Sequence, residues 1–396
     1  MTVVLWAATI GPAIASDPIR GSEWPLDAQH FQADKTWALS RGDGVTIAVV
    51  DSGVAASHPD LAGQVLPGTS LLGDGGDGRS DTSGDSHGTA VSGIIAGTGG
   101  ADGQGMTGLA PGAKILPVKV TADDQVSPST VAQGIVWAVD HGAKIVNVSI
   151  GTESPDPLLK QAVAYALRQD AVVVASAGNE GEKGNPVQYP AAFPGVLSVS
   201  GVNQDGSFWA PSESGASVAV AAPASDVYST NDQGQYVHAE GTSYAAAYVS
   251  ATAALIRSRW PQLTQGQVVR RIITGTKEHR AAPDARFGYG LLDPLSALTV
   301  DVPTSDLSNP LASPAAAHPK ASAPSRSPRP LWTVGALLAL SAAAGTAFLW
   351  RRSARTVKVP VSPTPRAPGK NSPQLTPKRS PKVKANGKTS ARQSGQ

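Results

Sequence analysis

The chain has no cysteine among its 396 residues, which excludes disulfides and cysteine-ligated metal sites. Aromatic residues are also scarce, at 5%, whereas apolar residues make up 41% and glycine and proline number 42 and 32. A sizeable core is therefore available, but it is built mainly from small side chains. The length suffices for one large domain with appendages, or for two domains.

Acidic residues are absent from the end of the chain. From Arg351 onward there are 12 Lys or Arg and no Asp or Glu, whereas the first 350 residues carry 20 basic and 30 acidic residues. Such an asymmetry indicates two different environments. The basic tail is typical of a nucleic-acid-binding arm or of a cytoplasmic segment beside anionic lipid. The second interpretation explains the charges more simply, and we expect no nucleic-acid partner.

The first apolar stretch, MTVVLWAATIGPAIAS, ends with small residues at Ala13 and Ala15. A small-x-small ending after an apolar run is typical of a secretory signal peptide, which we predict over residues 1–15. No basic residue precedes the apolar run, and a buried N-terminal strand is the alternative.

A second apolar stretch, residues 331–350, carries no charge over its 20 residues and has Trp332 and Trp350 near its ends. It is long enough to cross about 30 Å of hydrocarbon, with the tryptophans where an aromatic belt lies. A buried core helix is the alternative, but the Pro/Ala/Ser-rich linker 301–330 and the basic tail 351–396 provide no domain to bury it. Because positive residues stay inside, we predict a single-pass cell-membrane protein with a cytoplasmic tail and an extracytoplasmic domain.

Between these stretches, strand-like and helix-like patterns alternate. Helical patterns cover 129–141 and 156–169, and apolar runs of strand length cover 45–50, 114–120, 144–150, 171–177 and 196–202. Near-continuous Val and Ile runs that alternate with helices indicate an α/β fold, in which a mostly parallel sheet is covered on both faces.

Four polar residues follow these strands or begin helices. Asp51 follows strand 45–50, Asn179 follows the strand 171–177, and His87 and Ser243 each begin a helix of small residues. Taken singly, each has an ordinary explanation as a turn residue, a helix-start histidine or a helix N-cap. Together they supply the nucleophile, base, orienting carboxylate and oxyanion donor that acyl transfer requires.

The segments around these residues resemble the subtilisin-like serine proteases, or subtilases. VVDSGV (49–54), SHGTAVSGIIAG (86–97) and GTSYAAAYVSATAAL (241–255) are similar to the three signature segments of that family. SHPDL (57–61) and ASAGNEG (175–181) are similar to two further segments, and the order Asp, His, Ser is the subtilisin order. The resemblance covers roughly residues 35–300 and implies the subtilisin-like three-layer fold.

The resemblance also implies roles for individual residues. Ser243 would be the nucleophile, His87 the general base and then the acid, and Asp51 the carboxylate that orients His87. Asn179 would stabilise the oxyanion together with the Ser243 backbone N–H. An extended polypeptide substrate would pair with two segments, formed by Ser149, Ile150 and Gly151 and by Ala175, Ser176, Ala177 and Gly178. No cofactor is implied.

Two departures from the common subtilase pattern narrow the resemblance. Tyr244 and Ala247 stand where most subtilases have Met and Pro, and an aromatic residue after the serine resembles the mycosins, membrane-anchored subtilases of actinobacterial type VII secretion systems. Mycobacterial mycosins carry cysteines, so any such disulfide is lost here. The layout is also similar, with a signal peptide (1–15), an N-terminal extension (16–40), a peptidase domain (41–300), a linker (301–330), a transmembrane helix (331–350) and a disordered cytoplasmic tail (351–396).

The leading hypothesis is a membrane-anchored serine endopeptidase acting on extracytoplasmic proteins, with type VII secretion substrates and the type VII membrane complex as expected partners. The alternative is a structural stabiliser of that complex in which proteolysis is secondary or absent. A soluble degradative subtilase conflicts with the uncharged segment 331–350.

An acid-rich loop, residues 73–85, precedes His87 and contains Asp74, Asp77 and Asp81. Their oxygens are ligands of the kind that Ca²⁺ takes, but the spacing does not fit an EF-hand loop. A flexible loop beside His87 explains the composition without a metal, and we predict none.

Overall fold

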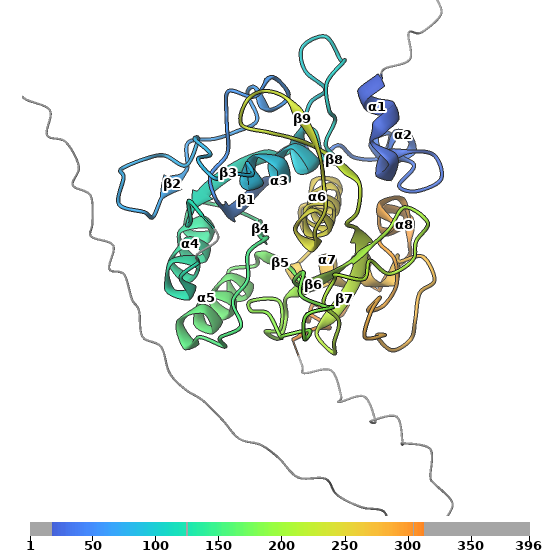
Figure 1. Cartoon of the computed structure of the whole chain (residues 1–396). Helices are drawn as coiled ribbons and strands as arrows, with labels where there is room; N and C mark the ends of the chain where they lie inside the picture. The colour runs from blue at the N-terminus through green and yellow to red at the C-terminus, as the bar shows by residue number, and fades with distance from the viewer. Residues whose placement is uncertain (1–17, 124–125, 304, 313–396) are drawn as a thin grey trace, which may run out of the picture. The chain divides into compact units, whose positions relative to one another are not determined.

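A parallel sheet of seven strands lies at the centre of the computed structural model, which describes residues 18–123, 126–303 and 305–312 (Figure 1). The spatial order is β2-β3-β1-β4-β5-β6-β7, and every pairing in it is parallel. The strands are β1 (Thr46–Asp51), β2 (Thr69–Ser70), β3 (Lys114–Lys119), β4 (Ile145–Val148), β5 (Val172–Ser176), β6 (Leu197–Val202) and β7 (Val218–Pro223).

Helices cover both faces of this sheet, because side chains along each strand point alternately to either side. In β1, Ile47 and Val49 pack in the core formed with α3 (His87–Ala96) and α6 (Thr242–Arg259). Ala48 and Val50 pack on the opposite side, with α4 (Pro128–Asp140) and α5 (Pro157–Arg168). The result is a three-layer α/β arrangement.

Helix α6 is buried from Thr242 to Arg257, since it contacts α3 on one side and β4 to β7 on the other. A helix surrounded by protein must present small or apolar residues all round. The segment TSYAAAYVSATAALI meets that requirement with alanines, and the small side chains let α6 approach the sheet closely.

The remaining elements surround this framework. They are α1 (Pro18–Ser22), η1 (Trp24–Leu26), α2 (Ala33–Trp37), η2 (Pro59–Leu61), α7 (Gln265–Thr274), α8 (Pro294–Thr299) and an antiparallel hairpin of β8 (Val227–Thr230) and β9 (Tyr236–Ala239). Helix α7 begins with a capping box, in which Thr264 and Gln267 satisfy each other's backbone N–H groups.

The predicted α/β class with a mostly parallel central sheet is confirmed. The five predicted strands correspond to β1, β3, β4, β5 and β6, and the two helical patterns correspond to α4 and α5. The strand predicted over 144–150 ends earlier, at Val148, and residues 149–151 that follow it are unpaired with β5.

Several predicted segments lie outside the described residues. These are the signal peptide (1–15), most of the linker (301–330), the transmembrane helix (331–350) and the tail (351–396). Within residues 18–123, 126–303 and 305–312, no helix has both the length and the hydropathy needed to cross a bilayer.

Candidate active site

The end of β1 and the start of α3 bring Asp51 and His87 together. The Nδ1 atom of His87 lies 2.7 Å from Oδ1 of Asp51, which also accepts the backbone N–H of Ser52 at 2.8 Å. A carboxylate only accepts hydrogen bonds, so Nδ1 carries the proton and Nε2 of a neutral ring is left as an acceptor. The next residue, Gly88, packs so closely on the Gly53 carbonyl that a Cβ would overlap it.

His87 is strongly influenced by its acidic surroundings. Burial lowers the pKa of His87, but the charge and hydrogen bond of Asp51, with the charges of Asp85 and Asp81, outweigh it and raise the pKa to about 9. The Tyr244 ring lies beside the imidazole, tilted by 48° to it with ring centroids 5.9 Å apart. The imidazole is therefore a stronger base than a free histidine.

Asp81 anchors the start of α3, a role that its place in an acid-rich loop did not suggest. Its side chain is 6% exposed, and its oxygens accept from the hydroxyls of Ser52 (3.0 Å), Ser83 (2.8 Å) and Thr89 (2.7 Å). Ser83 in turn accepts the backbone N–H of His87 at 3.2 Å. Asp81 thus connects the end of β1, the preceding loop and the helix that carries His87.

Ser243 lies in the first turn of α6 and is held against the end of β4. Its hydroxyl donates to the backbone carbonyl of Ser149 at 2.9 Å, and the Ser149 hydroxyl donates to the Ser243 carbonyl at 3.2 Å. Among the described residues no hydrogen bond joins the hydroxyl to His87, since the hydroxyl is directed at the Ser149 carbonyl. Buried hydrogen bonds connect Ser149 further to α6. Asn147 donates to the Ser149 hydroxyl at 2.7 Å and accepts from the Ser250 hydroxyl at 2.8 Å.

Asn179 is fixed by the residue that precedes the serine. Its Oδ1 accepts both the backbone N–H and the hydroxyl of Thr242, each at 2.9 Å, and the Thr242 hydroxyl accepts the Gly178 N–H at 3.1 Å. Because a backbone N–H only donates, the facing atom must be the amide oxygen, and the amide nitrogen is left for another acceptor. The Ser243 N–H, as a first-turn donor, likewise has no acceptor within α6.

These residues line one cleft of about 600 Å³. Asp51, His87, Asn179 and Ser243 all border it. Its remaining lining residues come from the loops that follow the strands, and they are Ser52, Ser83, Gly84, Asp85, Thr121, Ala122, Asp123, Val126, Ser149, Ile150 and Gly151. The structure thus brings the predicted catalytic and oxyanion residues together at the carboxyl edge of the sheet, where α/β folds place ligands.

Only one of the two predicted substrate segments borders the cleft. Ser149, Ile150 and Gly151 border the cleft just beyond β4. Ala175 lies instead inside β5, 1% exposed, where its backbone faces β4 and β6. Ser176 ends that strand, and Ala177 and Gly178 follow it toward Asn179.

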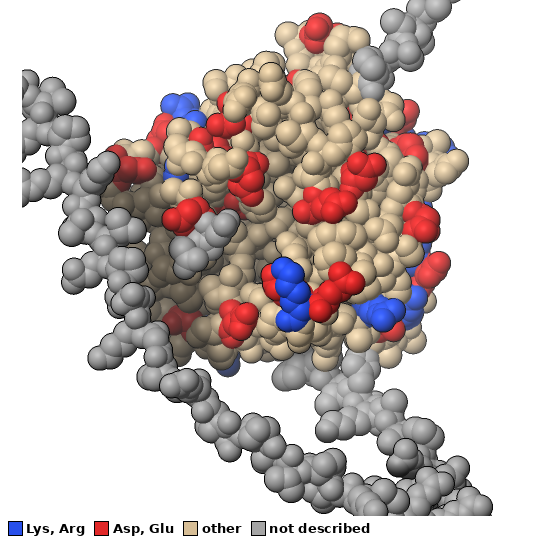
Figure 2. Space-filling model, in the orientation of Figure 1, with Lys and Arg blue, Asp and Glu red and all other residues tan. Residues whose placement is uncertain are grey.

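Negative charge gathers around this part of the molecule. Asp51, Asp85 and Asp123 line the cleft, which borders no Lys or Arg among the described residues. Figure 2 shows patches of Asp and Glu across the face toward the viewer, with isolated Lys and Arg among them. Such a surface attracts positively charged chains at low ionic strength.

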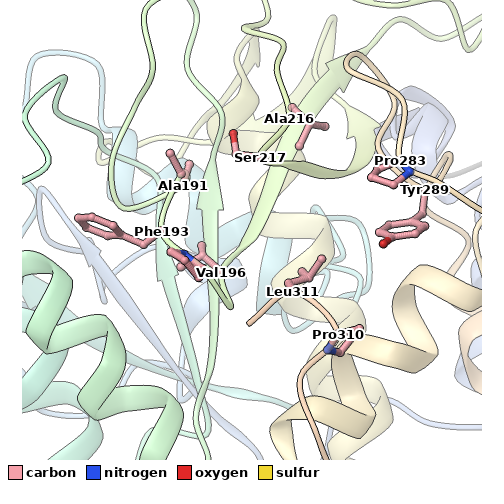
Figure 3. Close-up of a pocket in the computed structure, with 12 residues that line it drawn as sticks. Ala191, Phe193, Val196, Ala216, Ser217, Pro283, Tyr289, Pro310 and Leu311 are labelled. Atoms are coloured by element: carbon pink, nitrogen blue, oxygen red, sulfur yellow. The ribbon is translucent and has the colours of Figure 1, made fainter. Parts of the chain in front are cut away.

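A second cavity, of about 230 Å³, lies away from these residues (Figure 3). Val196 and Val218, which stand at the amino ends of β6 and β7, are among its lining residues, together with Phe193, Tyr289 and Leu311. The cavity is therefore at the opposite edge of the sheet, and it is lined by no acid, histidine, lysine or arginine of the described residues.

The acidic loop does not form a metal site within the part of the chain that the structure describes. Asp74 accepts the Gly76 N–H, Asp77 pairs with Arg79 at 2.8 Å, and Asp81 is buried in its own hydrogen bonds. No group of three His, Asp or Glu residues among the described ones is arranged to hold a metal ion.

The comparisons with known proteins agree on the family. Residues 42–290 match the model of the subtilase family, peptidase S8. Mycosin-1 of Mycobacterium tuberculosis is 33% identical over 330 residues, which span 69% of this chain and 72% of that protein. Subtilisin DY of Bacillus licheniformis is 37% identical over 253 residues, 63% of this chain and 89% of that protein.

Solved structures show the same relationship. MycP1 from Mycobacterium smegmatis superposes with a TM-score of 0.63 at 29% identity, covering 72% of this chain and 87% of that one. The MycP3 protease of the type VII (ESX-3) secretion system gives a TM-score of 0.59 at 33% identity, over 68% and 87% of the two chains. The chain therefore belongs to the subtilase family of serine endopeptidases, and mycosins are among its relatives.

Proposed function

We propose that this chain is a membrane-anchored serine endopeptidase that cleaves extracytoplasmic proteins through an Asp51–His87–Ser243 triad. The observation that carries the proposal is the cleft itself. It brings together a serine in the first turn of a buried helix, a histidine bound to a buried carboxylate at 2.7 Å, and an asparagine whose amide nitrogen is free to donate.

The reaction begins with a change of serine rotamer. Rotation about the Cα–Cβ bond takes the Ser243 hydroxyl from the Ser149 carbonyl to Nε2 of His87. The hydroxyl oxygen then attacks the scissile carbonyl carbon while its proton passes to Nε2. Asp51 stabilises the resulting imidazolium, and its bond to Nδ1 keeps Nε2 directed at the serine.

The tetrahedral oxyanion is bound by the Asn179 side-chain amide and the Ser243 N–H. Its collapse breaks the peptide C–N bond, and His87 delivers the proton to the leaving amine. Water, deprotonated by His87, then hydrolyses the acyl-enzyme and restores Ser243. Removing one oxyanion donor typically lowers kcat by about 10²- to 10³-fold, which sets the expected cost of Asn179→Ala.

The substrate backbone pairs with residues 149–151, while residues 176–178, whose backbone groups already bond Val199, Thr242 and Glu213, form the other side of the site. Ile150 and Gly151 border the cleft and are not paired within the sheet. These segments flank the serine and the oxyanion donor, so pairing would place the scissile carbonyl between the two.

The proposed setting is the outer face of the cell membrane, in a type VII secretion system. Two things support it: the similarity to MycP1 and MycP3, and the uncharged segment 331–350 followed by a basic tail. On this proposal the chain resists carbonate extraction from membranes, and deletion of 331–350 releases it. Release of the intact chain by carbonate would contradict the anchor.

The test of the catalytic proposal is labelling of the purified chain with a serine-reactive fluorophosphonate. Ser243→Ala is the control, since it removes only one oxygen. We expect labelling that is lost in Ser243→Ala and at least ten-fold slower in His87→Ala. A folded wild-type chain that is not labelled would contradict the proposal.

A second candidate function is stabilisation of the secretion complex without a need for proteolysis. The similarity to MycP3, a protease of the type VII (ESX-3) secretion system, supports this candidate. An experiment in cells distinguishes the two functions. Ser243→Ala still supports secretion if the chain acts as a stabiliser, and it fails to support secretion if proteolysis is required.

A further inference from the structure

A glutamate and a glutamine lie directly behind the two segments proposed to bind substrate. A Cβ on Gly178 would be 2.5 Å from the Glu213 carboxyl carbon, and a Cβ on Gly151 would be 2.9 Å from Oε1 of Gln188. Gln188 Nε2 donates to Glu213 Oε1 at 3.3 Å, so the two side chains connect the segments from behind. Glycine at both positions is what lets these polar groups come so close.

The Glu213 carboxyl group is buried without a cation. The residue is 3% exposed, its backbone N–H donates to the Gly178 carbonyl at 2.9 Å, and no salt bridge reaches it among the described residues. Burial raises the pKa of Glu213 to about 7, against the hydrogen bonds from the Gln188 side chain and the Glu180 backbone N–H, and the nearby charges of Glu153 and Glu180 add to the rise. Burying such a group is costly unless it is paired.

The position of Glu213 relative to the reacting atoms suggests what pairs with it. Asn179 follows Gly178 directly, and the Ser149 carbonyl contacts the Ser243 hydroxyl. A substrate whose carbonyl lies between Ser243 and Asn179 therefore directs the preceding side chain, called P1, between the two segments. That path leads toward the glycines and the carboxyl group behind them.

We propose that Glu213, held by Gln188, is a specificity-determining residue that selects substrates with lysine or arginine at P1. The inference rests on the proposed proteolytic function and names its substrate class. A cationic P1 side chain supplies the missing partner for the buried carboxylate, and hydrogen bonds between charged groups are roughly twice as strong as neutral ones. Asp85 and Asp123 of the cleft add attraction for basic stretches of the substrate.

The test compares peptides that differ only at P1, with lysine, norleucine or glutamate. Norleucine is the key comparison, because it has the lysine chain length without the charge. We expect wild-type kcat/KM for lysine to exceed that for norleucine by about 10-fold or more, the range expected for a charged hydrogen bond. Glutamate should be the poorest of the three, because it would face another carboxylate.

Glu213→Gln keeps the shape and removes the charge, so we expect it to bring the lysine-to-norleucine ratio close to 1. Glu182→Gln is the matched control, since Glu182 is an exposed acid in the neighbouring loop, and it should keep the wild-type ratio. Fluorophosphonate labelling of Ser243 in each variant verifies that the site is assembled.

Two failures are distinguishable. Equal cleavage of lysine and norleucine peptides by the wild type, or an unchanged ratio in a labelled Glu213→Gln enzyme, overturns this inference and leaves the protease intact. Absence of any Ser243-dependent cleavage or labelling overturns the proposed function, and the inference with it.

Discussion

At the scale of the residue, His87 determines how the activity depends on pH. Burial lowers the pKa of His87, but the three acids Asp51, Asp85 and Asp81 outweigh it and raise the pKa to about 9. Because a general base must be neutral, we expect kcat/KM to increase with pH through a limb well above 6.5 and near 9. Initial rates with a peptide substrate between pH 5 and pH 10 measure this limb.

The raised pKa of His87 makes stability fall with increasing pH, whereas activity rises. A histidine whose folded pKa exceeds its unfolded value stabilises the fold fully below the unfolded pKa of about 6.5 and loses that contribution as the pH rises through the folded pKa.

The variant Asp85→Asn tests the pH dependence of activity. It keeps the Asp51 hydrogen bond and removes an exposed charge, so it should move the activity limb to lower pH. A limb that stays in place would show that Asp85 is too well screened by solvent to matter.

Thr242 is a positioning residue that the resemblance did not single out. Its hydroxyl bridges the Gly178 N–H and the Asn179 amide oxygen. In Thr242→Val the backbone N–H still holds Asn179, but one of two anchors is lost, and we expect kcat to fall about 10-fold, less than the roughly 10²- to 10³-fold for loss of a whole donor. KM should change little, since the oxyanion exists only along the reaction path.

Thr242→Ser provides the control for this prediction, because it retains the hydroxyl and loses only a methyl group. It should restore most of the wild-type kcat. If Thr242→Val raised KM and left kcat unchanged, the residue would act on substrate binding rather than on the oxyanion donor.

At the scale of the element, hydrophobic pattern predicted most of the framework but few of its connections. The Val and Ile runs of β1, β3, β4, β5 and β6 are buried on both faces, and such runs are recognisable without tertiary information. The hairpin β8–β9 was not predicted, because its strands have four residues each and a mixed burial pattern.

Four residues of the site could also be predicted from the sequence. Asp51, His87, Asn179 and Ser243 stand in recognisable segments at strand ends and helix starts, and the structure places them in one cleft. The anchoring role of Asp81 and the role proposed for Glu213 were not visible, because both depend on contacts between residues far apart in the chain. Asp81 was considered as a calcium ligand from its acidic neighbours, whereas burial against Ser52 and Thr89 gives it a structural role.

The contact between β4 and α6 leads to a stability prediction. Asn147, which is fully buried, accepts from Ser250 of α6 and donates to the Ser149 hydroxyl. Asn147→Leu leaves the Ser250 hydroxyl without this partner, and an unsatisfied buried group costs about 1–3 kcal/mol. We therefore expect a loss of that size in the free energy of unfolding, measured by urea denaturation.

A double-mutant cycle separates this cause from a simple misfit of leucine. Ser250→Ala alone should destabilise less, and adding it to Asn147→Leu should recover part of the loss, because it removes the stranded hydroxyl. Strictly additive losses would mean that leucine is destabilising for steric reasons alone.

At the scale of the whole molecule, the peptidase core begins well before the region matched by the family model. The match starts at residue 42, yet Leu26 and Phe31 are buried in the same core as α6. Phe31 packs edge-on against Tyr248 of α6 at 5.3 Å. Within residues 18–41, these side chains therefore join the core that contains α6, and this stretch lies in the predicted N-terminal extension (16–40).

Trp24 is the residue that best tests this integration. It is 7% exposed, and its indole N–H donates to the carbonyls of Asp226 (3.0 Å) and Ser225 (3.3 Å), just before β8. Loss of a buried aromatic side chain typically costs about 3–5 kcal/mol. Trp24→Ala should therefore lower the free energy of unfolding by about 3 kcal/mol, whereas Gln29→Ala, at an exposed position of the same segment, should change it by about 0.5 kcal/mol or less.

The two variants also discriminate between alternative roles of the segment. If it were a removable covering, Trp24→Ala would detach it locally, and the main unfolding transition of the domain would be unchanged. If it belongs to the core, the segment unfolds together with the rest of the domain. The whole transition then shifts to lower urea concentration, because loss of the Trp24 side chain also weakens the packing of Phe31 and Leu26 on the core. The packing of Phe31 on Tyr248 favours the second result, because it joins the segment directly to the buried helix α6 at the centre of the domain.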